Sequence, residues 1–291
     1  MPEFLNNFFR LTRPLSNTKN ILLLCLVFFL LRPEINWLNI ILSIFSLSLI
    51  SSAIYAFNSF CDFKVDKDNK NKEHYSKAIK FFGGEKISFI VTLFIFWGLF
   101  LGLMINYYFL FCLILLLIFN FFYSSCQFRF KEKIIIDALI AGIFTFALRF
   151  IALWFVFAIS FPPILAILAL ISAKSGGYLL YKEMDRYFLI KQNIRNTITI
   201  FKRNTIVLVS GLLYFLAIIS AALMCFNERY FKIKILGFLP FYLLLMLPLV
   251  LPPILILYLK VFNKINISGR NLRFFGFLYA LLIVIILVFL I

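Results

Sequence analysis

The feature that most constrains this chain is a series of long apolar stretches separated by short polar segments. Hydrophobic residues make up 64% of the sequence, against about half in a soluble domain. The stretches are long enough for membrane-spanning helices, and none alternates like a membrane β-strand. We therefore predict an all-α, polytopic membrane protein, with residues 1–291 forming a single transmembrane domain. Its nine transmembrane helices are expected at about residues 20–31, 37–57, 87–106, 107–124, 134–158, 162–181, 205–225, 236–258 and 274–291.

The distribution of Lys and Arg predicts how these helices are oriented. With the N-terminus inside, the cytoplasmic segments contain 23 Lys and Arg and the external segments contain 4. Cytoplasmic segments are enriched in Lys and Arg, so this asymmetry favours a multi-pass inner-membrane protein with a cytoplasmic N-terminus and an external C-terminus. The net charge of +17 is then explained by loops that face anionic membrane lipids, and no nucleic-acid partner is expected. The cytoplasmic segments are residues 1–19, 58–86, 125–133, 182–204 and 259–273.

Acidic residues gather in two cytoplasmic loops, residues 58–86 and 182–204, which we predict to form the active site. In the first loop, Asn58, Asp62 and Asp66 are spaced i, i+4 and i+8, so they share one face if the preceding helix continues past the membrane. Two carboxylates one turn apart repel each other unless a cation lies between them. Mg²⁺ prefers one or two carboxylates together with phosphates and water. The pattern predicts a Mg²⁺–diphosphate site, with a solvated charged loop as the alternative because lysines alternate with the acids.

The second loop begins with a cluster of mixed charge, Lys182, Glu183 and Asp185. Charged residues at the mouth of a membrane helix are usually solvated, so this cluster by itself favours a structural interpretation. Two such clusters on the same membrane face are less easily explained in that way. Together they indicate one site that faces the cytoplasm.

Two cations lie inside predicted membrane helices. Arg149 lies deep in the helix of residues 134–158, and Lys174 lies part-way along that of residues 162–181. Charges within the membrane are costly and normally face a cavity or a partner. We interpret both as candidate substrate contacts. The alternatives are an ion pair within the bundle, with Asp137 nearby, or a lysine whose ammonium reaches the membrane surface.

Four short segments carry groups of polar residues that together resemble a known set of motifs. They contain Arg13-Pro14 with Lys19-Asn20, Asn58 with Asp62 and Asp66, Lys131 with Asp137 and Arg149, and Lys182 with Asp185. In this order they resemble the RPxxWxKN, NDxxDxxxD, LK…D…LR and KRxxE motifs of the UbiA-type membrane prenyltransferase superfamily, in its decaprenyl-phosphate phosphoribosyltransferase branch. Ser59 stands where Asp is usual, and Glu183 stands where the family commonly has Arg.

The resemblance implies a UbiA-like helical bundle and a Mg²⁺-dependent transferase. The expected reaction moves 5-phosphoribose, or a related sugar phosphate, from a phosphorylated polar donor to polyprenyl phosphate. The resemblance implies that Asp62 and Asp66 bind the metal and that Asn58 and Asp185 complete the catalytic group. It implies that substrates are bound by Arg13, Lys19, Lys131, Arg149 and Lys182. From their positions in the sequence, Lys174 and Glu183 are added as candidate substrate-binding residues.

Two other functions remain open at this point. A UbiA-type prenyltransferase would use the first cluster to transfer a prenyl chain from prenyl diphosphate to an aromatic or quinone precursor. A carboxylate-rich second cluster would suit that reaction, whereas Lys182 suits a phosphate-rich polar substrate. A transporter would place polar groups near mid-membrane on broken helices, whereas the acids of this chain gather at one face.

Overall fold

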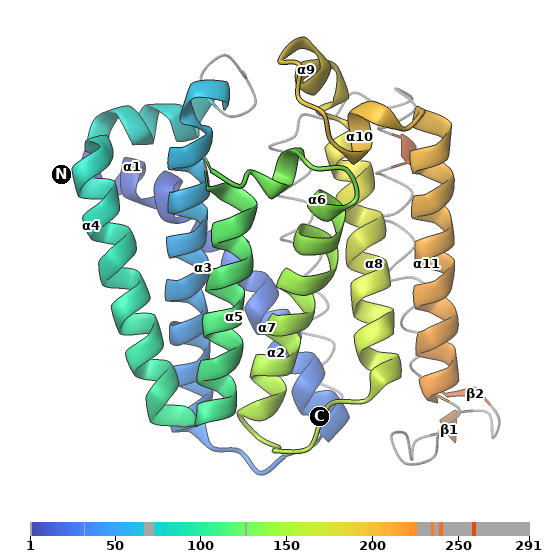
Figure 1. Cartoon of the computed structure of the whole chain (residues 1–291). Coiled ribbons are helices and arrows are strands. Elements are labelled where there is room, and N and C mark those ends of the chain that lie inside the picture. Colours follow the sequence, from blue (N-terminus) through green and yellow to red (C-terminus); the bar gives the residue numbers. More distant parts are fainter. Residues whose placement is uncertain are drawn as a thin grey trace.

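The structure, a computed structural model, describes residues 2–31, 33–66, 73–125, 127–225, 234–235, 239–240 and 258–259. Long helices stand side by side and form most of the described molecule (Figure 1). Apolar helices dominate because a helix satisfies its own backbone hydrogen bonds, which a membrane interior requires. The helices that form the bundle are α2 (Thr18–Leu31), α3 (Trp37–Asp66), α4 (Glu73–Ile105), α5 (Tyr107–Ser124), α7 (Thr145–Phe155), α8 (Ile164–Glu183) and α11 (Arg203–Cys225).

Shorter elements connect the long helices. Helix α9 (Arg186–Lys191) and helix α10 (Thr197–Ile200) lie at the same end of the bundle as the end of α3 and the start of α4 (Figure 1). The described β-structure is one antiparallel pair of two-residue strands, β1 (Lys234–Ile235) and β2 (Leu239–Pro240). The short helices are α1 (Pro2–Thr12), the 3₁₀ helices η1 (Pro14–Asn17) and η3 (Phe130–Glu132), α6 (Ile136–Ala138), the π-helix η4 (Leu139–Phe144), α9 (Arg186–Lys191) and α10 (Thr197–Ile200).

The described helices confirm the all-helical character of the chain. The first seven predicted apolar stretches correspond to helices, and the stretch at 134–158 is the succession of α6, η4 and α7. Six spans are long and apolar enough to cross a membrane among the residues described. Helix α2 has 14 residues, fewer than the roughly 20 that a full crossing needs. The predicted stretches 236–258 and 274–291 lie almost entirely outside the described residues, so nine transmembrane helices remain a prediction.

The predicted loop at residues 58–86 is mostly helical. Helix α3 continues to Asp66, so the polar residues from Asn58 onward lie on its last two turns, and α4 begins at Glu73. Helix α4 changes direction at Gly83, whose φ of 72° is one that side-chain-bearing residues rarely adopt. The described polar residues of this segment, those at 58–66 and 73–86, are therefore held on helices.

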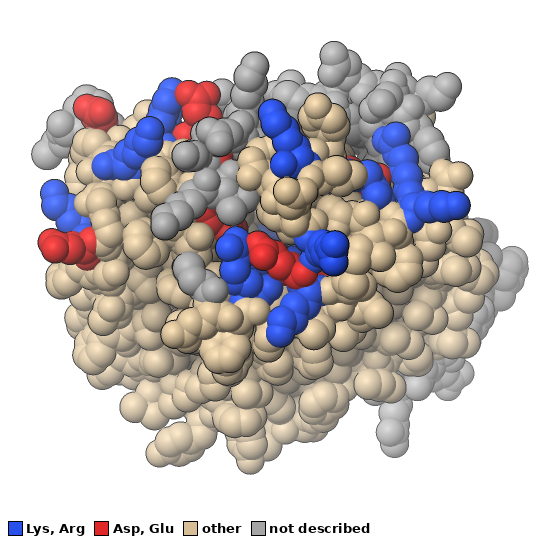
Figure 2. Space-filling view, turned by 45° about the horizontal axis from the view of Figure 1, so that its top comes forward, with Lys and Arg blue, Asp and Glu red and all other residues tan. Residues whose placement is uncertain are grey.

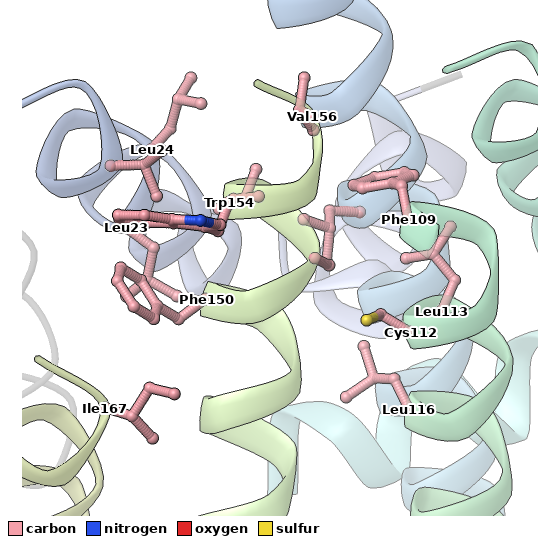
Figure 3. Packing of buried hydrophobic residues seen from close by; sticks show 14 of the residues in the cluster. Leu23, Leu24, Phe109, Cys112, Leu113, Leu116, Phe150, Trp154, Val156 and Ile167 are labelled. Atoms are coloured by element: carbon pink, nitrogen blue, oxygen red, sulfur yellow. The ribbon is translucent and has the colours of Figure 1, made fainter. Parts of the chain in front are cut away.

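The interior of the bundle is packed with apolar side chains from α2, α5 and α7. Leu23, Phe109, Leu113, Phe150 and Trp154 belong to one buried cluster (Figure 3). Membrane helices gain little from burying apolar surface against each other, because lipid tails are equally apolar. Close packing and hydrogen bonds between helices must therefore stabilise the bundle.

Small residues bring α8 close to its two neighbours. A Cβ atom on Gly142 of η4 would lie 2.8 Å from Ser175 Oγ and 3.2 Å from Ser175 Cα. On the other side of α8, Ser210 Oγ donates a hydrogen bond to the Gly176 carbonyl at 2.9 Å. Such contacts require small side chains at the crossing. They fix α8 between η4 and α11.

Candidate active site

A small cavity of about 40 Å³ lies at the end of the bundle where α3 and α8 both end. Lys, Arg, Asp and Glu side chains gather on this end of the molecule, whereas the side seen below it is almost free of charge (Figure 2). The cavity brings together five residues that the sequence predicted for one site. They are Asp62, Asp66, Lys131, Lys182 and Asp185, and we call this place the mouth cavity.

The mouth cavity places a lysine beside the two acidic side chains of α3. Lys131 Nζ forms an ion pair with Asp62 Oδ1, and only 10% and 15% of these two side chains are exposed. Lys131 is presented by the 3₁₀ helix η3, whose preceding residue Arg129 has a left-handed φ of 40°. Within the described residues, no group of three His, Cys, Asp or Glu lies close enough to hold a metal ion. A metal at Asp62 and Asp66 would therefore need oxygen ligands from water or substrate.

Asn58 and Ser59 lie about one turn deeper on α3 than Asp62. Asn58 Oδ1 accepts a hydrogen bond from Ser124 Oγ at 2.9 Å. Arg13 Nη2 donates to Ser59 Oγ at 2.6 Å, and its guanidinium lies 3.6 Å from the centre of the Tyr75 ring. Arg13 thus binds a neutral hydroxyl where the usual Asp would give it a carboxylate. No carboxylate in the described part of the chain forms an ion pair with it.

Glu183 does not line the mouth cavity, although the sequence placed it among the substrate ligands. Its carboxylate, 1% exposed, accepts hydrogen bonds from Arg186 Nε and Nη2 at 2.6 and 2.7 Å, and lies 3.8 Å from Arg203 Nε. These contacts join the end of α8 to α9 and to the first turn of α11. Glu183 therefore fixes the segment that carries Lys182 and Asp185.

Three further polar residues line the mouth cavity that sequence patterns did not single out: Arg129, Glu132 and Asn196. Asn196 is completely buried and caps α10, since its Oδ1 accepts from the backbone N–H groups of Ile198 and Thr199 at 3.1 Å each. The run Asn-Thr-Ile-Thr is the signal that would have found this cap. The Nδ2 group of Asn196 has no hydrogen-bond partner in the described residues, so it can donate to a ligand.

Asp137 is buried in a hydrogen-bond network of its own. Its Oδ1 accepts from Thr197 Oγ1, and the Tyr178 hydroxyl lies 3.5 Å from its Oδ2. Thr197 Oγ1 also accepts from the backbone N–H of Ile135 at 2.7 Å, and Ile135 has a φ of 67°, a strained value for a β-branched residue. Among the described residues no ion pair joins Asp137 to Arg149, whose Nη1 donates to Asn20 Oδ1 instead.

The remaining predicted cations lie deeper in the bundle than the mouth cavity. Arg149 is 1% exposed, and its Nη1 donates to Asn20 Oδ1 at 2.9 Å. The ammonium of Lys19 donates to the Tyr55 hydroxyl. Lys174 lies on α8 more than two turns before Lys182. Sequence patterns gave no sign of Tyr55, because a tyrosine within an apolar helix is ordinary.

A family model matches most of the chain. Residues 21–282 match the model described as the UbiA prenyltransferase family. The comparison with curated proteins gave no match.

Solved structures share the fold over nearly the whole chain. A UbiA homolog from Archaeoglobus fulgidus bound to GPP and Mg²⁺ is 17% identical, with a TM-score of 0.74 and 96% of each chain covered. Digeranylgeranylglyceryl phosphate synthase is 18% identical, with a TM-score of 0.68, covering 98% of this chain and 97% of that one. An apo UbiA homolog from Aeropyrum pernix K1 is 14% identical, with a TM-score of 0.69, covering 94% of this chain and 95% of that one. At these identities the likeness establishes the fold.

Proposed function

We propose a reaction for this chain from the premise that it belongs to the UbiA prenyltransferase family and is a membrane transferase. The reaction is the transfer of 5-phosphoribose, or a related sugar phosphate, from its diphosphate donor to polyprenyl phosphate. The observation that supports it is the mouth cavity, where the carboxylates of Asp62 and Asp66 share one lining with the cations of Lys131 and Lys182. Paired carboxylates suit a metal, and added cations suit a substrate with several phosphates.

Asp62 and Asp66 fit a Mg²⁺ ion. They offer two carboxylates one turn apart, and Mg²⁺ usually completes its octahedron with water and substrate phosphates. The structures of the Archaeoglobus fulgidus homolog with GPP and Mg²⁺ and with DMAPP and Mg²⁺ support this choice of metal. When bound, Mg²⁺ would neutralise the charge that develops on the departing diphosphate. Asn58, one turn deeper, would orient a diphosphate oxygen or a water of the metal.

Lysines of the mouth cavity would bind the phosphates of the donor. Lys131 can exchange the Asp62 carboxylate for a phosphate oxygen once a metal ion takes that carboxylate. Lys182 approaches from the end of α8 on the other side of the cavity. A donor with a 5-phosphate and a diphosphate carries more negative charge than one Mg²⁺ neutralises, so both lysines are needed. Asp185 would accept a hydrogen bond from a ribose hydroxyl.

The transfer itself needs no strong general base. The bond from C1 of the ribose to the diphosphate oxygen breaks, and the bonding electrons leave with the diphosphate. An oxygen of the lipid phosphate forms the new bond to C1. This nucleophile is already an anion near neutral pH.

The second candidate is prenyl transfer from a prenyl diphosphate to an aromatic or quinone precursor. The GPP and DMAPP complexes of the Archaeoglobus fulgidus homolog favour it. Against it stands the second cluster, which contributes one carboxylate, Asp185, and one cation, Lys182, to the mouth cavity. Membership in a family of transferases leaves the transporter hypothesis without support.

A direct assay tests the proposal. The purified full-length protein is incubated with Mg²⁺, labelled 5-phosphoribosyl diphosphate and polyprenyl phosphate, and we expect label in the lipid fraction and release of diphosphate. The same protein with labelled prenyl diphosphate and an aromatic acid tests the second candidate. No saturable binding of 5-phosphoribosyl diphosphate to the wild-type protein would end the phosphoribosyl proposal.

The proposal also places the mouth cavity on the cytoplasmic side of the inner membrane. This follows from the excess of Lys and Arg in the segments at that end, 23 against 4. A reporter active only in the cytoplasm, fused after Ile291, is expected to stay silent. Strong activity of that fusion would contradict a nine-helix topology with an external C-terminus.

A further inference from the structure

We propose that Lys19, Asn20, Tyr55, Arg149 and Lys174 form a second anion-binding site inside the bundle, which holds the phosphate group of the lipid substrate. We call it the deep cation site. The identity of its ligand rests on the proposed function, whereas the existence of the site rests on the contacts and charges of these residues.

Tyr55 of α3 is the point that the cations of this site share. Its hydroxyl accepts a hydrogen bond from Lys19 Nζ, and this ammonium lies 4.9 Å from the centre of the Tyr55 ring. The side chains of Arg149 and Lys174 both lie near the Tyr55 hydroxyl. The positive charges of Lys19, Arg149 and Lys174 therefore lie close enough together to repel one another. Helices α2, α7 and α8 thus each direct one cation toward the same part of α3.

No carboxylate balances these three charges in the described part of the chain. None of its ion pairs includes Lys19, Arg149 or Lys174. The sequence has 12 Asp and Glu, of which only Asp68 and Glu228 lie outside the described residues, in polar segments between predicted helices. Like charges in a low-dielectric interior destabilise each other unless a counter-charge is present. An anion that is not part of the chain supplies that counter-charge.

Two buried N–H groups of the site point to the same conclusion. Arg149 Nε and Asn20 Nδ2 have no hydrogen-bond partner in the described residues. Their side chains belong to residues that are 1% and 0% exposed, so ordinary surface water does not satisfy them. Buried hydrogen-bond donors without partners are rare, and each one indicates a bound ligand or an ordered water. Lys19 and Lys174 keep some accessible surface, so the site is not sealed by protein atoms.

The position of the site along α3 identifies which phosphate it holds. Tyr55 precedes Asp62 by seven residues, which is two turns on the same helix face and about 10 Å deeper in the bundle. The departing diphosphate binds at Asp62 and Asp66, so the nucleophile must approach the reacting carbon from the other side. A phosphate held below the mouth cavity on the same face satisfies this requirement. A lipid phosphate also brings an apolar tail, which the apolar surroundings of the deep site accept and the charged mouth does not.

Binding of a lipid phosphate without metal tests this inference. The purified full-length protein, in detergent with EDTA, is titrated calorimetrically with geranylgeranyl monophosphate and with the uncharged alcohol geranylgeraniol. We expect saturable binding of the monophosphate and much weaker binding of the alcohol. Lys174→Met should weaken monophosphate binding at least about tenfold, whereas Lys174→Arg, which keeps the charge, should stay within about threefold. Lys77→Met serves as the matched control, because Lys77 is an exposed lysine paired with Glu73.

Arg149→Gln provides a second variant at the most buried position of the site, and it should also lose monophosphate binding. Its elution from a sizing column and its Mg²⁺-dependent donor binding show whether it is folded. Equal monophosphate binding by wild-type protein and Lys174→Met, or equal binding of monophosphate and alcohol, would overturn the deep cation site. Ribose 5-phosphate is tested as a competitor of the monophosphate. If it displaces the monophosphate, and if Lys174→Met also weakens its binding, the assignment of the site to the lipid would be overturned. Lysine-dependent monophosphate binding by a protein that binds no 5-phosphoribosyl diphosphate would support the site while ending the proposed function.

Discussion

The mouth of the bundle and its interior both carry charged side chains, but they balance those charges in different ways. At the mouth, Lys131 is paired with Asp62, so cations and carboxylates are mixed in one cavity. In the interior, Lys19, Arg149 and Lys174 have no carboxylate partner among the described residues. A mixed site can take up a metal ion and a phosphate together, by exchanging partners. A site of cations alone can accept only an anion, so the two regions suit two different substrates.

The largest effect that separates the two regions is expected from Asp62→Asn and Asp66→Asn. Each variant removes one of two carboxylates for the metal, and we expect turnover to fall at least about 100-fold, because a metal ion contributes several kcal/mol of charge stabilisation. Binding of geranylgeranyl monophosphate in EDTA should be unchanged, because no ion pair among the described residues joins a carboxylate to Lys19, Arg149 or Lys174. Turnover is measured with labelled donor at saturating Mg²⁺. Near wild-type turnover in either variant would mean that these acids are merely solvated.

A smaller effect, again confined to the mouth, is expected from Lys182→Ala. A lysine that binds a phosphate as a point charge contributes enough to weaken donor binding about tenfold when it is removed. Binding of the lipid phosphate should change less than about threefold, because Lys182 lies more than two turns from Lys174 along α8. Titration of 5-phosphoribosyl diphosphate with Mg²⁺ measures the first quantity. Equal losses of affinity for the donor and for the lipid phosphate would mean that both bind at one site.

Sequence patterns predicted the parts of this molecule that depend on apolar length or on a helical spacing of charges. The first seven apolar stretches became helices, and Asp62 and Asp66 line one cavity because residues four apart on a helix share a face. The π-helix at Leu139–Phe144 was not predictable, since hydropathy does not register how tightly a helix is wound.

The rest of the candidate site depends on contacts between distant segments. Asn20 and Tyr55 are uncharged and sit in ordinary helical surroundings, and only the fold brings them to Arg149 and Lys174. Glu183 looked like a ligand because every charge at a helix end looks alike in a sequence. Its second partner, Arg203, lies 20 residues further along the chain and is brought near by α11.

The role of Glu183 gives a prediction about stability and not about binding. Glu183→Gln keeps the shape of the side chain but removes the charge that Arg186 and Arg203 share, so we expect the folded state to lose about 1 kcal/mol. Thermal unfolding in detergent measures the loss. Glu73→Gln, at an exposed ion pair with Lys77, is the control and should have no measurable effect. An unchanged melting temperature in Glu183→Gln, together with weaker donor binding, would show that Glu183 binds substrate and does not stabilise the fold.

The smallest effect is expected at Ser59, which lies on α3 between the two regions. Ser59→Asp restores the acid that is usual in the UbiA motif, but it places that acid within hydrogen-bond distance of Arg13, whose Nη2 now lies 2.6 Å from the Ser59 hydroxyl. Arg13 has no carboxylate partner among the described residues, so it should pair with the new acid and keep it from the metal. The Mg²⁺ concentration for half-maximal turnover should therefore change less than about twofold, since Mg²⁺ needs only one or two carboxylates.

Donor affinity in Ser59→Asp should fall a few-fold, because an ion pair screens the charge of Arg13 from an anionic substrate. Ser59→Ala separates this effect from loss of the hydroxyl, since it leaves the charge of Arg13 uncompensated and should bind donor nearly as well as wild type. A roughly tenfold drop in the Mg²⁺ requirement of Ser59→Asp would show instead that the new acid reaches the metal. In that case the mouth cavity extends one turn deeper along α3 than its present lining, and the distance between the metal-dependent region and the deep cation site shrinks to one helical turn.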